Sequence, residues 1–158
     1  MTVIIFTLLN PCGTRSVFNR VNVKNMAKKI LLIEDDVNLL YGLQAKFSVE
    51  GFSVATDAGS EKSEILEKIR VVKPDYIILD IILPRVDGFE VLKEIKTNPQ
   101  FSGLPVYIFT NLSDDDSRQR AAKLGADWYL LKIDFNLDEF VEKFKKIITN
   151  YVYQENWH

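Results

Sequence analysis

The chain has 158 residues, of which 47% are hydrophobic and 27% charged, so it is long enough for one domain with a buried core. Its net charge of −2 does not suggest a nucleic-acid-binding surface. A single cysteine, Cys12, excludes an intrachain disulfide, and the only histidine, His158, is the last residue, which argues against a Ser–His or Cys–His catalytic pair. No apolar run reaches the roughly 18 residues of a membrane span. We therefore expect a cytoplasmic protein that neither inserts into a membrane nor binds nucleic acid directly.

The first residues differ from the rest of the chain. The short apolar stretch at residues 3–9 lacks the charged region that opens a signal peptide. The segment "MAKKILLIEDD", from Met26, looks like an ordinary beginning. We expect residues 1–27 to be a poorly ordered or non-native extension, residues 28–151 to form one domain, and residues 152–158 to be a short tail.

From residue 28 onward, short apolar runs alternate with amphipathic segments. The apolar runs predict strands at residues 29–34, 52–56, 75–80, 104–110 and 127–132. Helical spacing of apolar residues predicts helices at residues 37–51, 60–72, 88–98, 113–125 and 137–152. The fourth of these helices opens with Ser113 and Asp116, the spacing of a capping box.

This alternation indicates the fold class. Strands made almost entirely of Val, Ile and Leu are typically covered on both faces. Strand–helix alternation favours a parallel sheet with right-handed crossovers. The sequence therefore predicts an α/β domain of three layers, doubly wound, with five βα units and a five-stranded parallel sheet.

Polar residues interrupt the apolar runs at the same end of each strand. Glu34, Asp35 and Asp36 follow the first strand, and Asp80 ends the third. Thr110 ends the fourth strand and Lys132 the fifth, as the sequence shows. Because the carboxyl ends of parallel strands lie along one edge, where ligands of open α/β sheets bind, we expect these groups to converge.

Such a cluster has a readable chemistry. Glu34, Asp35 and Asp80 would not all stay ionised together without a cation. Oxygen ligands without Cys or His select a hard metal, Mg²⁺ or alternatively Mn²⁺. One carboxylate would remain free to attack phosphorus, with Thr110 and Lys132 bonding the transferred oxygens. We expect Asp80 to lie at a strand tip beside the metal and Lys132, exposed enough for a phosphodonor to reach.

Each of these residues also has a simpler interpretation. Asp35 or Asp36 could cap the first helix, since aspartate is a favoured N-cap. Thr110 is an ordinary β-branched strand residue, Lys132 could be a solvated strand end, and Asp80 could pair with a buried lysine. Only the ordered set, at the strand ends of a five-fold βα pattern, is specific.

Four segments carry a family resemblance: "ILLIEDD", "IILDIILPRVDG", "IFTN" and "GADWYLLK". Together and in order they resemble the receiver domain of response regulators in two-component signalling. The resemblance covers about residues 28–150 and implies a flavodoxin-like fold of the single-domain type.

The resemblance also implies roles for individual residues. Asp80 would be the phospho-acceptor, and Glu34 and Asp35 would hold Mg²⁺ with the backbone carbonyl of Ile82. Thr110 and Tyr129 would form the switch, although a rim-packed strand aromatic is the simpler reading of Tyr129. Lys132 would bond the phosphoryl oxygens, and Pro84 and Gly88 match the family's loop after the acceptor strand.

The sequence departs from the family pattern near Lys132. The family usually has proline after this lysine, often with a cis bond, but here Ile133 follows. We expect a trans bond or a strained cis bond, and a differently placed loop before the last helix. Two positions that often tune dephosphorylation are Ile82 and Leu112, both apolar, so we expect slow self-dephosphorylation.

The resemblance implies that a histidine kinase or histidine phosphotransfer protein phosphorylates Asp80. An unknown downstream protein would read the change on the face of the fourth helix, last strand and last helix, which carries Arg118, Lys123, Trp128 and Lys143. The chain would catalyse only its own phosphorylation and dephosphorylation, and so is not expected to be an enzyme. A phosphorylation-independent adaptor is the alternative. An aspartyl phosphohydrolase is disfavoured, because Ile82 stands where a second aspartate is expected.

Overall fold

The computed structural model describes residues 27–155. Expectations for Cys12 and His158, for the extension up to residue 26 and for the end of the tail lie outside these residues. The strands are β1 (Lys29–Ile33), β2 (Ser53–Asp57), β3 (Tyr76–Leu79), β4 (Val106–Thr110) and β5 (Trp128–Leu131). The helices are α1 (Val37–Val49), α2 (Lys62–Val72), α3 (Gly88–Thr97), α4 (Asp115–Lys123) and α5 (Leu137–Glu155), with a short 3₁₀ helix, η1 (Lys132–Asp134).

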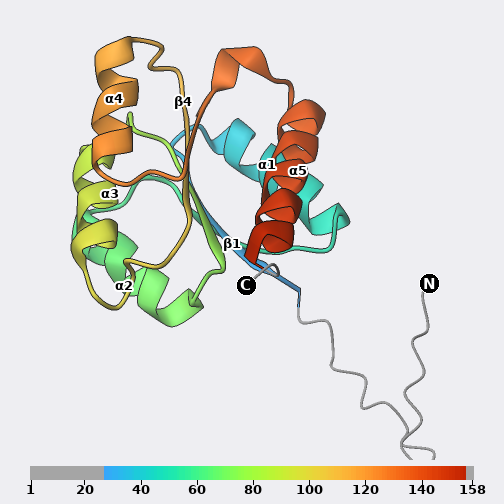
Figure 1. Ribbon diagram of the computed structural model, residues 1–158, viewed down its shortest axis with the longest axis horizontal. Coiled ribbons are helices and arrows are strands. Elements are labelled where there is room, and N and C mark those ends of the chain that lie inside the picture. The colour runs from blue at the N-terminus through green and yellow to red at the C-terminus, as the bar shows by residue number, and fades with distance from the viewer. Residues whose placement is uncertain (1–26, 156–158) are drawn as a thin grey trace, which may run out of the picture.

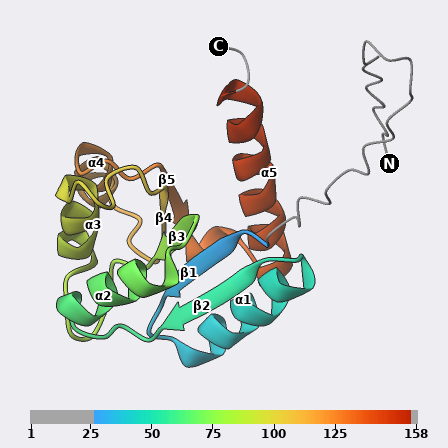
Figure 2. The same cartoon turned by 90° about the horizontal axis from the view of Figure 1, so that it is seen from below.

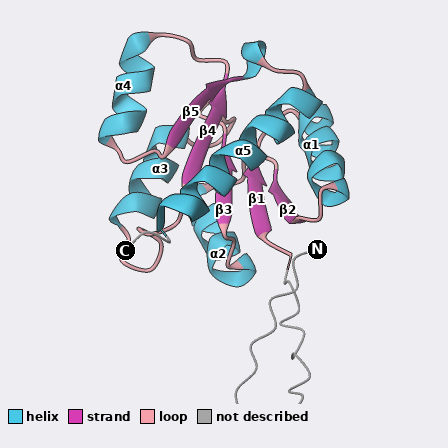
Figure 3. Cartoon of the chain, turned by 45° about the vertical axis from the view of Figure 1, so that its right-hand side comes forward, coloured by secondary structure: helices cyan, strands magenta, loops and turns pink. Residues whose placement is uncertain are grey.

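The five strands form one parallel sheet in the order β2-β1-β3-β4-β5, which Figure 3 shows from one side. The expected α/β architecture is thus confirmed, with five βα units wound in both directions from β1. In the register of the sheet, Ile33 of β1 lies opposite both Asp57 of β2 and Leu79 of β3. The strand ends therefore form a common edge, as the sequence predicts.

One face of the sheet is covered by α2, α3 and α4, which stand to the left of the strands in Figure 1. Ile65 and Ile69 of α2, Leu92 of α3 and Ala121 of α4 are fully buried against β1, β3 and β4. Full burial of a larger aliphatic side chain, such as isoleucine or leucine, contributes about 1.5–3 kcal/mol to the stability of the fold.

The other face is covered by α1 and α5, and its core is aromatic. Phe47 of α1 meets Phe144 of α5 with ring centroids 5.3 Å apart, edge to face. Phe140 of α5 stacks on Phe109 of β4 at 3.8 Å. Figure 2 shows the carboxyl end of α5 extending away from the other helices. This helix reaches Glu155, beyond its predicted end at residue 152, because no Gly or Pro in residues 153–155 stops it.

The start of α4 differs from the prediction. Asp114, and not Ser113, is the N-cap, and its carboxylate accepts a hydrogen bond of 2.8 Å from the backbone N–H of Ser117. A charged acceptor at a helix N-terminus interacts favourably with the helix dipole, which a serine hydroxyl does not match. The predicted capping box of Ser113 and Asp116 is therefore wrong.

The bond between Lys132 and Ile133 is trans, and the described residues contain no cis peptide bond. Lys132, Ile133 and Asp134 form the 3₁₀ turn η1, with Ile133 83% exposed. Of the helices in residues 27–155, none combines the length and apolar character needed to cross a membrane.

Candidate functional site

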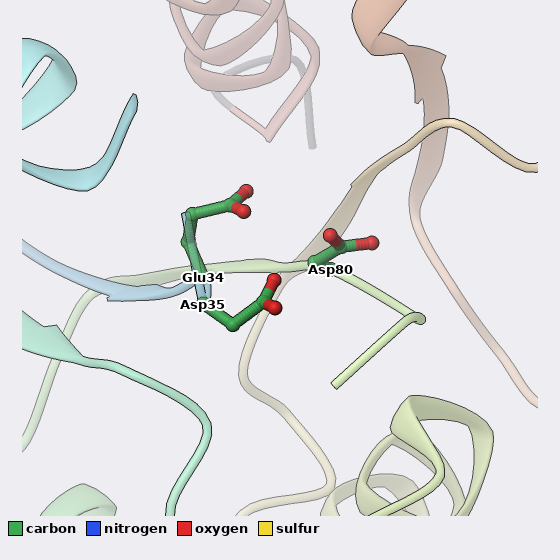
Figure 4. Close-up of side chains that lie close together, drawn as sticks. All are labelled: Glu34, Asp35 and Asp80. Atoms are coloured by element: carbon green, nitrogen blue, oxygen red, sulfur yellow. The ribbon is translucent and has the colours of Figure 1, made fainter. Parts of the chain in front are cut away.

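The acidic residues meet at the carboxyl edge of the sheet. Glu34 and Asp35 follow β1 directly, and Asp80 follows β3 directly. One carboxylate oxygen from each of the three lies within 4.8 Å of the others. Figure 4 shows the three side chains close together at the ends of these two strands. The convergence expected from the strand order is therefore present.

Lys132, which follows β5, contacts two of the three acids. Its Nζ lies 2.6 Å from Oδ2 of Asp80 and 2.7 Å from Oε2 of Glu34. The lysine side chain is only 13% exposed, and those of Glu34 and Asp80 are 5% and 4% exposed. The interpretation of Lys132 as a solvated strand end is therefore wrong.

These groups line a pocket of about 420 Å³. Its other lining residues come mainly from α1, β4 and the segment before α5: Asp36, Leu39, Phe109, Asn111, Phe135, Asn136 and Leu137, together with Ile82 after β3. Asp80 lines this pocket but is buried, 4% exposed, whereas we expected an exposed carboxylate at a strand tip. Asp80 does follow β3 and lie beside Lys132, as expected, but the expected exposure is wrong. Its two oxygens are bonded by Nζ of Lys132 and by the backbone N–H of Ile82.

The site holds more negative than positive charge. Burial raises the pKa of the Glu34 carboxyl, because its ionised form loses hydration, and the bond from Lys132 offsets this only in part. Burial acts to lower the pKa of Lys132, but the bonds to Asp80 and Glu34 outweigh it, so this pKa is raised and the group stays an ammonium. One ammonium is thus shared by two buried carboxylates, with Asp35 a third carboxylate beside them.

This donor set fits a hard divalent cation. Its side-chain ligands are carboxylate oxygens, and no Cys or His lines the described pocket, which favours Mg²⁺ or Mn²⁺ over zinc. Added positive charge would also balance the excess negative charge of Glu34, Asp35 and Asp80. Three carboxylates are fewer than the six ligands of an octahedron, so further oxygen ligands, such as water or phosphate oxygens, would complete it.

The loop after Asp80 folds back on itself beside the pocket. The backbone N–H of Ile82 donates to Oδ1 of Asp80 at 3.1 Å, and Ile82 pairs with Asp87 in an antiparallel bridge. A Cβ on Gly88 would lie 2.6 Å from the carbonyl oxygen of Asp80, so this close approach requires glycine. The loop thus holds the backbone of Ile82 at the pocket wall.

The two expected switch residues do not line the pocket. Thr110 is fully buried, and its Oγ1 accepts only a long bond, 3.4 Å, from the backbone N–H of Leu112. The Tyr129 hydroxyl donates to the carbonyl of Leu112 at 2.9 Å, and the guanidinium of Arg118 lies 5.0 Å from its ring centroid. Burial, together with the carboxylate of Asp114, raises the pKa of the Tyr129 hydroxyl.

Asp36 has the structural role that the sequence left open. Its Oδ1 accepts hydrogen bonds from the backbone N–H groups of Asn38 and Leu39, so it caps α1. Asp35 does not cap the helix, and its carboxylate joins the acidic cluster.

The four residues expected on a readout face lie on α4, β5 and α5. Trp128 of β5 is 39% exposed, and Nζ of Lys143 on α5 lies 5.9 Å from its ring centroid. Arg118 and Lys123 lie on α4.

Two residues were missed by the sequence reasoning. Asn111 follows Thr110, lines the pocket and was not considered. Asp57 is the last residue of β2 and is 2% exposed, but the predicted strand ended at residue 56. The rule that found Asp80, a polar residue at the end of an apolar run, would have found Asp57.

Fold and site together define a flavodoxin-like α/β domain with an acidic, lysine-paired pocket at the carboxyl edge of its sheet. A family model described as the response regulator receiver domain matches residues 30–145, more than half of the chain. This chain belongs to the response regulator receiver family.

Relatives agree with this assignment. The chain is 34% identical, over 107 residues, to the alkaline phosphatase synthesis transcriptional regulatory protein PhoP of Bacillus subtilis (strain 168). The matched residues make up 68% of this chain and 43% of that protein. The phosphorylated cyanobacterial phytochrome response regulator RcpA has a TM-score of 0.66 and 28% identity, over 77% of this chain and 91% of that chain. The Mn²⁺-bound form of response regulator Rcp1 has a TM-score of 0.63 and 27% identity, over 73% of this chain and 88% of that chain.

The chain spans about half the length, or less, of the curated relatives it matches. The expectation that it binds no nucleic acid directly gains no support, since PhoP is named a transcriptional regulatory protein and is matched over less than half its length.

Proposed function

We propose that this chain is the phospho-accepting receiver of a two-component phosphorelay, with Asp80 as the acceptor. The observation that carries the proposal is the 2.6 Å contact between Nζ of Lys132 and Oδ2 of Asp80 in a pocket shared with Glu34 and Asp35. A carboxylate that lines a pocket beside an ammonium is suited to take up a transferred phosphoryl group. RcpA, a solved relative, is named as a phosphorylated response regulator, which supports the proposal.

In the proposed reaction, an oxygen of the Asp80 carboxylate attacks the phosphorus of a phosphohistidine on a histidine kinase or phosphotransfer protein. The new P–O bond forms as the P–N bond breaks, and the imidazole nitrogen keeps the electron pair. Lys132 donates a charge-assisted hydrogen bond to the incoming phosphoryl oxygens.

Glu34, Asp35, Asp80 and the carbonyl of Ile82 would hold Mg²⁺, with Mn²⁺ as a substitute. The Mn²⁺-bound form of Rcp1 supports divalent cation binding in general. When bound, the metal supplies positive charge that offsets the acceptor and phosphoryl charges.

The proposal includes a switch and a readout surface. Phosphorylation shifts a two-state equilibrium in which Thr110 turns toward the phosphoryl group and Tyr129 moves with it. When Tyr129 moves, it loses the hydrogen bond that its hydroxyl donates to the Leu112 carbonyl. This bond connects β5 to the segment before α4. The change is read by a downstream protein on the face of α4, β5 and α5. We place this phosphorelay in the cytoplasm and assign the receiver unit to residues 28–151.

Intact mass tests the proposal. The protein is incubated with Mg²⁺ and acetyl phosphate, and a gain of one phosphoryl group is expected for the wild type but not for Asp80→Asn. Asp75→Asn is the matched control, because Asp75 precedes β3 at its opposite end and bonds Lys28 and Lys29 instead of the pocket. No gain with any donor, while binding to a partner persists, would instead favour a phosphorylation-independent adaptor.

A further inference from the structure

A third buried carboxylate lies at the carboxyl edge of the sheet, outside the acidic cluster. Asp57 ends β2 and is 2% exposed. Its Oδ1 accepts hydrogen bonds of 2.8 Å from both the backbone N–H and the hydroxyl of Ser60. Its Oδ2 accepts a bond of 2.7 Å from Nζ of Lys68. Asp57 is therefore fully bonded within the protein, and it fixes the turn from residue 57 to residue 60.

This turn is anchored to two elements at once. Lys68 lies on α2, and its Nζ also donates to the carbonyl of Thr56 at 3.0 Å. The carbonyl of Asp57 accepts the backbone N–H of Glu34 at 2.9 Å. The turn is thus tied through Lys68 to α2 and through a backbone bond to the first acid of the pocket. Both attachments hold the start of the turn, at residues 56 and 57, and the bonds from Ser60 to Asp57 close it.

The same turn touches the loop after Asp80. Gly59 has φ +77°, and a Cβ built on it would lie 2.8 Å from Cδ of Pro84 and 3.4 Å from Cδ2 of Leu83. The loop is closed on itself by the bond from Gly88 N–H to the Ile81 carbonyl, 3.1 Å. Pro84 lies inside this closed loop, two residues after Ile82, which lines the pocket.

We infer that Asp57 and Gly59 are positioning residues of the acidic pocket. The turn they form packs against Leu83 and Pro84. This packing fixes the position of the loop and so keeps the backbone N–H of Ile82 directed at Asp80. The side chains of the turn do not line the pocket, so their effect passes through the loop. The part of the inference that concerns Mg²⁺ rests on the proposed function; the part that concerns the loop does not.

Two glycine variants separate contact from backbone strain. Gly59→Ala introduces a residue at positive φ and also the overlap with Pro84. Gly51→Ala is the matched control, since Gly51 has φ +89° and nothing lies within 4 Å of the added Cβ. We expect Gly59→Ala to weaken Mg²⁺ binding by about tenfold, as displaced supporting groups typically do, and Gly51→Ala to leave it unchanged. Binding is measured by isothermal titration calorimetry.

A double variant tests the contact itself. Pro84→Ala in the Gly59→Ala background removes the overlapping Cδ and should restore most of the Mg²⁺ affinity. Equal affinities for Gly59→Ala and Gly51→Ala would overturn the inference. If Gly59→Ala does not fold, Ser60→Ala, which removes the hydroxyl bond to Asp57, replaces it and should weaken binding in the same direction.

Amide hydrogen exchange in the metal-free protein supplies a readout that does not depend on the metal. Gly59→Ala should speed exchange at residues 81–88 several-fold, whereas Gly51→Ala should not. Unchanged exchange would overturn the inference even if Mg²⁺ binds. A wild-type protein that binds no Mg²⁺ would instead contradict the proposed function, and the exchange data would still decide whether the turn positions the loop.

Discussion

Nζ of Lys132 lies 2.6 Å from Oδ2 of Asp80, although 52 residues separate them. Asp80 follows β3 and Lys132 follows β5, and β4 lies between these two strands in the sheet. The lysine side chain therefore reaches across the end of β4 to meet the acid. This pairing places a buried positive charge between Asp80 and Glu34, and several expected properties follow from it.

Removing the shared ammonium should destabilise the metal-free protein. Lys132→Met leaves the carboxylates of Glu34 and Asp80 buried without a cation, which typically costs about 3–5 kcal/mol in the free energy of unfolding. Mg²⁺ should recover part of this loss, because it offsets the same charges. Urea unfolding with and without Mg²⁺ measures both effects.

Lys145→Met is the control for this variant. Nζ of Lys145 also bonds two carboxylates, those of Glu50 at 2.6 Å and Glu142 at 2.8 Å, but these are far more exposed. Its loss should lower the free energy of unfolding far less than the loss of Lys132, with no response to Mg²⁺, because exposed ion pairs are screened by solvent. Equal costs for the two variants would contradict the view that Lys132 neutralises buried charge.

Asp57 should give a distinct dependence of stability on pH. Burial acts to raise the pKa of Asp57, but the bonds from Lys68 and Ser60 outweigh it, so this pKa lies below its ordinary value of 3.8. The unfolded chain then binds the proton more readily, and the stability that Asp57 contributes is complete above pH 3.8 and is lost as pH falls through the folded pKa.

Asp57→Asn should therefore cost about 1–3 kcal/mol at pH 7, and this difference from the wild type should shrink below pH 3.8. Urea unfolding of both proteins across pH 2–7 measures the difference. A difference that stays constant down to the lowest pH would show that the carboxylate charge is not what stabilises the turn.

The lifetime of the phosphorylated protein should depend on Ile82. This side chain lines the pocket, is 52% exposed and cannot position a water molecule by hydrogen bonding. Ile82→Asn supplies an amide there and should speed dephosphorylation by about tenfold, the effect of about 1.4 kcal/mol on the barrier. The decay of the phosphorylated mass with time measures it.

Ile133→Asn is the matched control, because Ile133 is 83% exposed and does not line the pocket. The phosphorylated form of this variant should last as long as the phosphorylated wild type, and we expect both lifetimes to be long. A wild-type lifetime of seconds would reject the expectation that apolar residues at positions 82 and 112 slow the reaction.

Tyr129→Phe should separate phosphorylation from its readout. The variant loses the bond to the Leu112 carbonyl, which should cost about 1 kcal/mol of stability. Because Tyr129 does not line the pocket, the rate of phosphoryl uptake should not change. The phosphorylation-dependent change in amide exchange of residues 112–124 should shrink, and a slower uptake with an unaltered exchange response would contradict the proposed role.

Periodicity in the sequence predicted the five strands and five α-helices of residues 27–155, because a parallel sheet covered on both faces leaves runs such as "YIIL" without polar interruption. It did not predict the 3₁₀ helix η1, which begins at Lys132, where the last strand was expected to end. Because the carboxyl ends of parallel strands share one edge, the sequence then predicted that four of these residues lie close together: Glu34, Asp35, Asp80 and Lys132. The predicted ends of elements were less accurate. Asp57 fell one residue outside its predicted strand, and Asp114 replaced Ser113 as a cap, because single hydrogen bonds decide these positions.

The sequence by itself determined the order of elements, the parallel sheet and the identity of the acidic set, since these depend on local patterns and strand direction. Only the tertiary structure decided that Asp80 is buried and that the ammonium of Lys132 contacts both Asp80 and Glu34. It alone showed that the turn at Gly59 abuts Pro84. Burial and contact depend on which segments, distant in sequence, cover a strand end, and no spacing along the chain encodes that distance.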